Sequence, residues 1–317
     1  FDMREGSPIP ANTLRATSVP FRGFAPAGKG DDLEVAMSLT DEMVEWQEQY
    51  FNYPYPYAKL DILAVPDFAY GAMENAGAII YRETALLVNE RTPLSRRRAI
   101  LTTHAHELSH QWFGNLVTPK WWDDIWLNEA FATWMSSKTM DGLNPNDGYD
   151  RATLRSSLGA MSSDSLSTAR QIRNPINGNA DINDAFDGIT YRKGGGVLSM
   201  FETYLGEDAF RDGIRVHMKR FEDQSADVDD FMSSLAEGSG QPDVVDSFKS
   251  FIFQPGIPYL NVTATCEAGV GTVSVTQQRY APLGSSIDMD GSTWQVPFAM
   301  RVGTGNESTI VRQMLKD

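Results

Sequence analysis

The chain has 317 residues, of which 41% are hydrophobic and 11% aromatic, so it is long enough for two or three folded domains. Its formal net charge of −15 argues against nucleic acids and anionic membranes as partners. No run of about 18 apolar residues occurs, so we expect no membrane span, and the single cysteine, Cys266, excludes a disulfide within the chain.

Composition and periodicity divide the chain into three expected segments. Residues 1–33 are rich in Pro, Gly and polar residues, and we interpret them as the tail of an upstream β-rich domain with a linker. Residues 34–257 combine strand patterns with helical patterns. Alternating apolar and polar residues predict a small β-sandwich-like module over 258–317, which ends without an obvious terminal strand. The expected fold class is therefore α+β.

The central segment begins with a predicted helix and two predicted strands. The helix covers 38–51, with Thr40 as its N-terminal cap. The strands cover 60–65 and 78–81. Between the strands, Gly71–Asn75 is by itself typical of an ordinary turn.

A helix that carries three of the chain's four histidines is predicted next. Thr92 suits its cap, Pro93 its first helical position and Gly114–Asn115 its end. His104 lies two residues before His106 and therefore points to another side of this helix, so we interpret it as structural.

A second helical pattern follows at 126–134, and the rest of the central segment is mainly helical. His217 has no potential metal ligand near it in sequence and is expected to be a surface or packing residue. The further helices are predicted at about 145–161, 190–204, 207–222, 227–237 and 242–253.

The histidine helix contains the motif His-Glu-x-x-His at His106, Glu107 and His110, and Glu129 follows after eighteen residues. Histidines four apart project from one helix face, and two imidazoles with a carboxylate suit Zn²⁺ with one position open for water. Glu107 can reach that water, as in metal-assisted hydrolases. The alternatives without a metal site are that the histidines belong to a polar helix face and that Glu129 is an acid favoured by the helix dipole.

Several further segments stand in a fixed order around this motif. They are Gly71-Ala72-Met73-Glu74-Asn75, His110-Gln111-Trp112-Phe113-Gly114-Asn115, Trp121-Trp122-Asp123-Asp124 and Phe186-Asp187-Gly188-Ile189-Thr190-Tyr191-Arg192-Lys193-Gly194. With His-Glu-x-x-His and Glu129 they resemble the M1 family of zinc aminopeptidases, a branch of the thermolysin-like peptidases. The resemblance covers roughly residues 35–257. It implies a thermolysin-like domain over 34–257, with a small mixed β-sheet lobe and a mainly helical lobe.

The resemblance also implies roles for individual residues. His106, His110 and Glu129 would bind one zinc ion, with Glu107 as the general base. Tyr191 would donate a hydrogen bond to the oxyanion of the tetrahedral intermediate. In the segment before the histidines, the expected roles concern substrate binding. Glu74 would hold the free α-amino group, and Gly71 and Ala72 would bind the peptide backbone. Met73 would form part of the pocket for the first side chain, and Asn75 is counted with these substrate-binding residues.

Two departures from the family pattern concern small residues. Ala130 stands where many relatives have glycine, a change that should be tolerated. Gly194–Gly196 stands where relatives often carry alanines. Because each glycine in a helix costs about 0.5–1 kcal/mol relative to alanine, this triplet is expected to loosen the helix that carries Tyr191.

The predicted activity is hydrolysis of the N-terminal peptide bond of peptides with a free N-terminus. Two alternatives stay open: a thermolysin-like endopeptidase, and an inert metal-binding scaffold or fragment. Relatives usually have a full N-terminal β-domain and a large helical C-terminal domain, so we expect such domains to be missing here. The compartment stays open between cytoplasmic, periplasmic and secreted.

Overall fold

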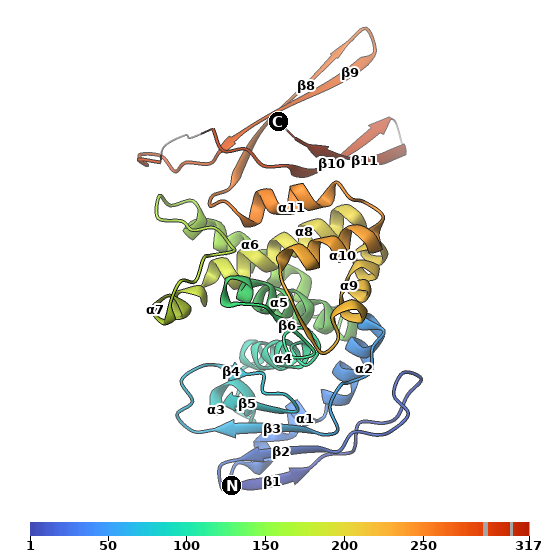
Figure 1. Ribbon diagram of the computed structural model, residues 1–317, viewed down its shortest axis with the longest axis vertical. Coiled ribbons are helices and arrows are strands. Elements are labelled where there is room, and N and C mark those ends of the chain that lie inside the picture. Colours follow the sequence, from blue (N-terminus) through green and yellow to red (C-terminus); the bar gives the residue numbers. More distant parts are fainter. Residues whose placement is uncertain (288–290, 305–306, 317) are drawn as a thin grey trace. The chain divides into compact units, whose positions relative to one another are not determined.

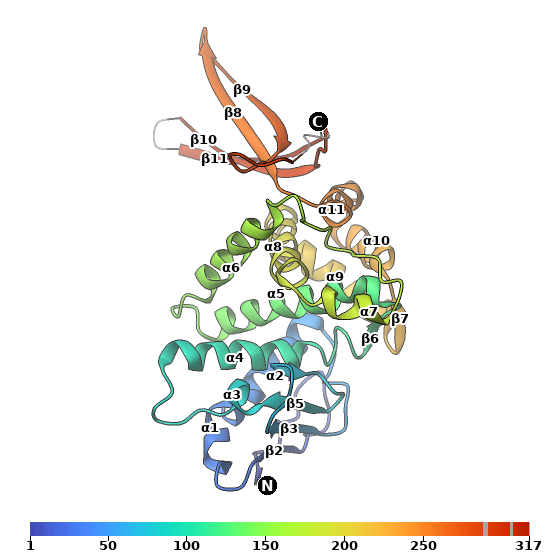
Figure 2. The same cartoon turned by 90° about the vertical axis from the view of Figure 1, so that its left-hand side faces the viewer.

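A computed structural model describes residues 1–287, 291–304 and 307–316. The chain forms two compact units of mixed α and β structure (Figures 1 and 2). Unit 1 comprises Phe1–Lys120, Phe131–Thr153 and Ile214–Asp227, and unit 2 comprises Trp121–Ala130, Leu154–Gly213 and Val228–Asp317. The predicted combination of a mixed sheet with helices is confirmed.

Unit 1 contains a five-stranded sheet in the order β1-β2-β3-β5-β4. The strands β2, β3 and β5 are mutually parallel, and β1 and β4 add antiparallel edges. The two strands predicted from the sequence, β3 and β5, are confirmed, and residues 1–33 supply two more. The bounds are β1 Asp2–Glu5, β2 Phe21–Ala25, β3 Leu60–Val65, β4 Ala72–Met73 and β5 Ala78–Arg82.

The sheet of unit 1 is accompanied by helices, of which the histidine helix α4 packs against α1, α2, α3 and β4. Figure 2 shows α4 running alongside α2 and α3. A short second sheet pairs β6 with β7 in parallel. The bounds are η1 Gly30–Leu33, α1 Glu34–Met37, α2 Thr40–Phe51, α3 Glu83–Leu86, α4 Leu94–Ser109, β6 Val117–Pro119 and β7 Gln224–Ala226.

The predicted ends of two of these helices are wrong. Thr40 is the first residue of α2 rather than its cap, and its hydroxyl donates to the carbonyl of Ala36. Pro93 has an extended backbone with ψ 151°, so it precedes α4 at the cap position that was predicted for Thr92. Helix α4 ends at Ser109, not at the predicted Gly114–Asn115. The chain turns directly after it, and the backbone N–H of Asn115 donates to the carbonyl of His110.

Helix α5, Ile125–Leu143, begins in unit 2 and continues into unit 1. The predicted helices after it are confirmed, with ends that differ by up to four residues. In unit 2, Phe201 of α8 stacks on Phe248 of α11 with ring centroids 3.8 Å apart. The bounds are η2 Trp122–Asp124, α6 Tyr149–Asp164, α7 Asn179–Ile182, η3 Asn183–Ala185, the π-helix η4 Ile189–Lys193, α8 Gly194–Leu205, α9 Glu207–Phe221, α10 Val228–Ser239 and α11 Val244–Ile252.

The described residues after α11 form two antiparallel hairpins. Strand β8, Pro258–Glu267, pairs with β9, Val270–Arg279, and β10, Val296–Thr304, pairs with β11, Glu307–Leu315. Trp294 is fully buried just before β10, and the Ser247 hydroxyl of α11 donates to the carbonyl of Gln295 at 2.5 Å. Helix α11 thus holds the start of the second hairpin.

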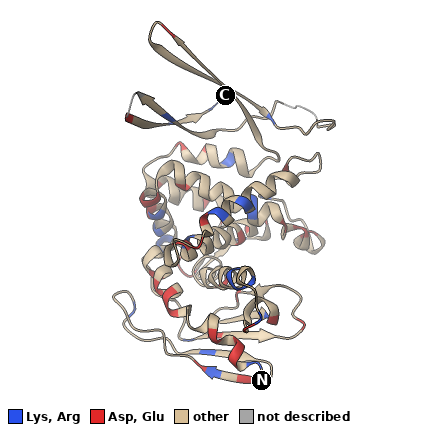
Figure 3. Cartoon of the chain, turned by 180° about the vertical axis from the view of Figure 1, so that it is seen from behind, with Lys and Arg blue, Asp and Glu red and all other residues tan. Residues whose placement is uncertain are grey.

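Charged residues are spread over many elements. Figure 3 shows Lys and Arg scattered among Asp and Glu along helices and strands. None of the helices in the described part of the chain combines the length and apolar character that crossing a membrane requires.

Candidate metal centre

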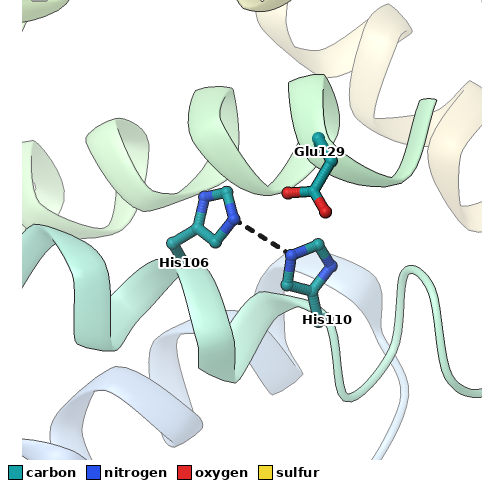
Figure 4. Close-up of side chains that lie close together, drawn as sticks. All are labelled: His106, His110 and Glu129. Atoms are coloured by element: carbon teal, nitrogen blue, oxygen red, sulfur yellow. Dashed lines mark hydrogen bonds between the residues drawn. The ribbon is translucent and has the colours of Figure 1, made fainter. Parts of the chain in front are cut away.

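His106 and His110 lie at the end of α4, where the helix brings both imidazole rings to one side. Their Nε2 atoms are 3.0 Å apart, and the ring planes stand at 82° to each other (Figure 4). His110 is the residue that terminates the helix, and it is buried. The i,i+4 spacing therefore produces the convergence that the sequence predicts.

Glu129, on α5, completes the predicted set of three ligands. One ligand atom from each of His106, His110 and Glu129 lies within 4.8 Å of the other two. Figure 4 shows the carboxylate turned toward the two rings. Glu129 is only 6% exposed, and a carboxylate buried to this degree needs a cation or hydrogen-bond donors.

The outer nitrogen of each ring has its own partner. Nδ1 of His110 lies 3.1 Å from the backbone carbonyl of Phe113. Nδ1 of His106 lies 3.5 Å from the hydroxyl of Thr133, one turn after Glu129 on α5. A carbonyl can only accept, so the Nδ1 of His110 carries the proton and its Nε2 presents a lone pair. This arrangement orients the ring as metal-binding histidines require.

The donor set and its spacing fit a zinc ion. Two imidazole nitrogens and a carboxylate are the ligands of many catalytic zinc sites. Two ligands at about 2.0–2.1 Å from a tetrahedral zinc ion lie about 3.3 Å apart, close to the 3.0 Å between the two Nε2 atoms. Only small shifts of the rings would be needed to hold the ion.

Glu107 and Glu74 form a second group with His110. One ligand atom from each of these three residues lies within 4.8 Å of the other two. Glu107 precedes His110 by three positions on the same helix and is 6% exposed. Glu74 follows strand β4, so the chain brings two acids together beside one histidine from segments 33 positions apart.

The predicted substrate segment surrounds Glu74. Ala72 and Met73 form β4, which pairs with Tyr81 and Ile80 of β5. The carbonyl of Gly71 accepts from the amide of Arg82 at 2.9 Å, and the carbonyl of Asn75 accepts from the amide of Ala78 at 2.9 Å. Among the described strands, β4 pairs only with β5 and is the edge of its sheet.

Tyr191 lies in unit 2, in the π-helix η4. This helix is tied at its start, where Arg170 bonds the Asp187 carboxylate at 2.6 Å and the Thr190 hydroxyl at 2.8 Å. Lys193, at its end, contacts Asp164 at 2.7 Å. Burial lowers the pKa of Lys193, and the carboxylate of Asp164 opposes this effect without cancelling it.

The remaining two histidines are structural, as the sequence predicts. His104 is fully buried, with Nδ1 2.8 Å from the Tyr81 hydroxyl and Nε2 2.9 Å from the Thr40 hydroxyl. Burial lowers the pKa of His104 to about 4. His217 is buried and stacks on Phe113 with ring centroids 5.5 Å apart, which confirms a packing role.

The sequence analysis assigned no role to three residues that contact this site. Thr133 contacts His106, and its position four residues after Glu129 was a signal for a shared helix face. Gln111 and Asn115 contact the backbone at Glu74. No pattern in the sequence pairs them with Glu74, because the contacts join segments 37 and 41 residues apart.

Comparison with known proteins places the chain among peptidases. A sequence model of the peptidase family M1 domain matches residues 35–251. The chain is 36% identical over 302 residues to a leucyl aminopeptidase of Saccharolobus solfataricus, covering 95% of the chain and 36% of that relative. It is 36% identical over 287 residues to aminopeptidase M1 of Arabidopsis thaliana, covering 90% of the chain and 32% of the relative.

A third relative is the puromycin-sensitive aminopeptidase of Caenorhabditis elegans, 34% identical over 303 residues, covering 95% of the chain and 32% of that relative. The chain spans about a third of the length of the curated relatives it matches. Because the family match covers more than half of its residues and contains both helices that converge on the metal centre, the chain belongs to peptidase family M1.

Proposed function

We propose that the chain is the catalytic region of a zinc-dependent aminopeptidase that hydrolyses the N-terminal peptide bond of peptides. The observation that carries this proposal is the convergence of ligand atoms from His106, His110 and Glu129 within 4.8 Å. Membership of family M1 and relatives named aminopeptidases give independent support.

In this proposal the three ligands hold one zinc ion, and Glu107 is the general base. When bound, zinc in such a site lowers the pKa of a water ligand to about 7 and polarises the scissile carbonyl. Glu107 takes a proton from the attacking water and passes it to the leaving amine, a contribution of roughly 10²–10⁴-fold. Tyr191 donates a hydrogen bond to the developing oxyanion, which is worth about 10²–10³-fold.

Glu74 gives the site its preference for a chain end. Its carboxylate pairs with the free ammonium group of a substrate, and an internal peptide bond offers no such cation. The proximity of Glu74 to Glu107 and His110 supports this role, because the amine and the scissile bond of an N-terminal residue are only a few atoms apart. An acetylated substrate leaves the carboxylate unpaired, which penalises binding.

The strand β4 supports a mode of substrate binding. An edge strand offers backbone N–H and C=O groups to an extended peptide. Gly71 and Ala72 would bind the substrate backbone in this way, while Met73 forms part of the pocket for its first side chain and Asn75 belongs to the same substrate-binding segment. Met73 is 39% exposed and is therefore accessible to a substrate.

The domain assignment belongs to the same proposal. We assign residues 34–257 to a thermolysin-like peptidase domain and 258–317 to a β-sandwich-like module, of which 288–290, 305–306 and 317 lie outside the described residues. The partners are peptides with a free N-terminus. In the whole protein we expect N- and C-terminal domains beyond this chain, in keeping with the greater length of the relatives.

The test is hydrolysis of aminoacyl reporters by the wild type and by Glu107→Gln. We expect release of the reporter to stop with a chelator and to return with zinc. The Glu107→Gln variant should bind zinc with unchanged stoichiometry and lose at least about 10²-fold in kcat. Faster cleavage of acetylated peptides than of free ones would favour the endopeptidase, and zinc binding without any hydrolysis would favour the scaffold.

A further inference from the structure

The turn that carries Glu74 is attached to the chain that follows the histidine helix. Residues 74–77 connect β4 to β5, and Gly77 has φ 65°, a conformation that favours glycine. Two amide side chains, Gln111 and Asn115, reach this turn from the segment after α4. Gln111 is fully buried, so its hydrogen bonds form away from water.

Gln111 contacts both ends of the turn. Its Oε1 accepts from the amide of Gly77 at 2.9 Å, and its Nε2 donates to the carbonyl of Glu74 at 3.2 Å. The same Nε2 lies 3.3 Å from the carbonyl of Glu107. Asn115 adds a second donor to the carbonyl of Glu74 at 2.7 Å. The backbone at Glu74 is therefore fixed by two side chains at once.

These contacts fix the separation between the backbone segments that carry Glu74 and Glu107. Gln111 directly follows His110 and bonds the backbone of Glu107, while it also bonds the backbone of Glu74. The side-chain amide of Gln111 thus connects the backbone of Glu74, the proposed amine-binding residue, to the backbone of Glu107, the proposed base. Because a displacement of about 1 Å at a reacting centre can cost 10²-fold in rate, this coupling has a direct consequence for specificity.

We propose that Gln111 and Asn115 are positioning residues that determine exopeptidase specificity, by holding Glu74 one substrate residue away from the scissile bond. The inference rests on the proposed aminopeptidase function and adds the residues that enforce it. Neither side chain needs to touch the substrate. Their effect is on the distance between the anchored amine and the hydrolytic groups, so it should differ between substrates with a free and a blocked amine.

The experiment uses the full chain with Gln111→Met, Asn115→Leu and the double variant, which replace each side-chain amide by an apolar group. Each is assayed on a leucyl reporter and on the same reporter with an acetylated amine. We expect the ratio of kcat/KM for free to acetylated reporter to fall about tenfold in each single variant and further in the double variant. The activity on the acetylated reporter should change less than about threefold.

A matched control is Gln47→Met. Gln47 of α2 is also fully buried, and its Nε2 donates to the Ala105 carbonyl and the Ser109 hydroxyl of α4. This variant should lower thermal stability and leave the ratio of free to acetylated reporter unchanged. Zinc content, measured by elemental analysis, should equal that of the wild type in all variants.

Three outcomes separate the inference from the function on which it rests. If the wild type shows no preference for the free amine, the proposed aminopeptidase function fails. If the wild type has that preference and both variants keep it within twofold, the positioning role is overturned. Loss of zinc from the variants would also overturn it, because the amides would then act on the metal site rather than on Glu74.

Discussion

At the scale of single residues, Thr133 is the contact most open to a direct test. Its hydroxyl lies 3.5 Å from Nδ1 of His106, and such partners of liganding histidines typically contribute 10–100-fold to metal affinity. We expect Thr133→Val to weaken zinc binding by about tenfold, the lower end, because the contact is long. Competition with a fluorescent chelator measures this affinity.

Thr139→Val is the control for that measurement. Thr139 lies on the same helix and is fully buried, but its hydroxyl donates to the Met135 carbonyl. The control should lose stability while its zinc affinity stays at the wild-type value. Equal zinc affinity in Thr133→Val and the wild type would show that Thr133 does not orient His106.

The residues of the metal centre differ in how far the sequence can predict them. His106 and His110 follow from helix geometry alone, because an i,i+4 pair needs no tertiary information. The prediction of Glu129 depended on its spacing of eighteen residues after His110 and on the chemistry of a two-imidazole, one-carboxylate site, and the family resemblance supported it. Gln111 and Asn115 stand in one of the segments that carry the resemblance, but the sequence does not reveal their partners, because these are backbone groups of a distant turn.

At the scale of elements, two glycines of α8 have a packing role that the sequence analysis did not predict. A Cβ at Gly194 would lie 2.6 Å from the Cβ of Ala130 on α5, and a Cβ at Gly196 would lie 2.9 Å from the Cβ of Ser157 on α6. These glycines permit close approach of neighbouring helices. The helix propensity cost of these glycines therefore accompanies close packing between helices.

Ala130 and Gly194 should therefore behave as a coupled pair. We expect Gly194→Ala to destabilise the protein by about 1–3 kcal/mol, because two helices must move apart. Adding Ala130→Gly should recover most of this loss, apart from about 1 kcal/mol of helix propensity. Chemical denaturation of the four proteins in the double-mutant cycle measures the coupling.

The matched control for this cycle is Gly159→Ala on α6. A Cβ at Gly159 would meet no atom within 4 Å, so this variant should stabilise the protein by about 0.5–1 kcal/mol. Strict additivity of Gly194→Ala and Ala130→Gly would mean that the two helices adjust independently, and the close contact would then have no energetic role.

The parallel pair β2–β3 carries a pH-dependent ion pair. Arg22 and Asp61 are direct partners in the register, and the guanidinium binds the carboxylate through two bonds of 2.8 and 2.9 Å. Burial raises the pKa of Asp61, but the bonds from Arg22 and Lys59 outweigh burial and hold the pKa below its ordinary value of 3.8. The folded state therefore favours the charged carboxylate.

This direction fixes the sign of the pH effect. A lowered pKa in the folded state gives stability that is fully present above pH about 4 and is lost as pH falls through the folded value. We expect Asp61→Asn to be less stable than the wild type by about 1 kcal/mol at pH 7, as for a bidentate pair whose arginine side chain is 42% exposed. Urea denaturation at pH 7 and pH 3 should show this difference shrinking on acidification, and a constant difference would contradict it.

At the scale of the whole molecule, the sequence predicted the class of fold but not how its segments join. The composition of residues 1–33 indicates the tail of a separate upstream β-rich domain with a linker. In the structure β1 and β2 extend the sheet that contains β3 and β5. Strand β2 is buried because it pairs with β3, which lies far along the chain, and local composition does not indicate this pairing. Phe21 of β2 is accordingly only 4% exposed.

The proposed metal centre is expected to stabilise this fold when it binds zinc. Its ligands come from α4 and α5, and the unfolded chain would not hold them together. A ligand at 100 times its Kd stabilises the native state by about 2.7 kcal/mol. Zinc should therefore raise the unfolding temperature of the chelator-treated protein, by an amount that grows with zinc concentration, and calorimetry measures this shift.

Two variants separate the stabilisation of the fold by zinc from catalysis. Glu129→Gln replaces a charged ligand by a neutral amide of the same shape, so the zinc-dependent shift should largely disappear. Glu107→Gln leaves all three ligands in place, so the shift should persist although hydrolysis is lost. If zinc raised the unfolding temperature equally in Glu129→Gln and in the wild type, the ion would be binding elsewhere, and the assignment of α4 and α5 as the zinc-binding helices would be wrong.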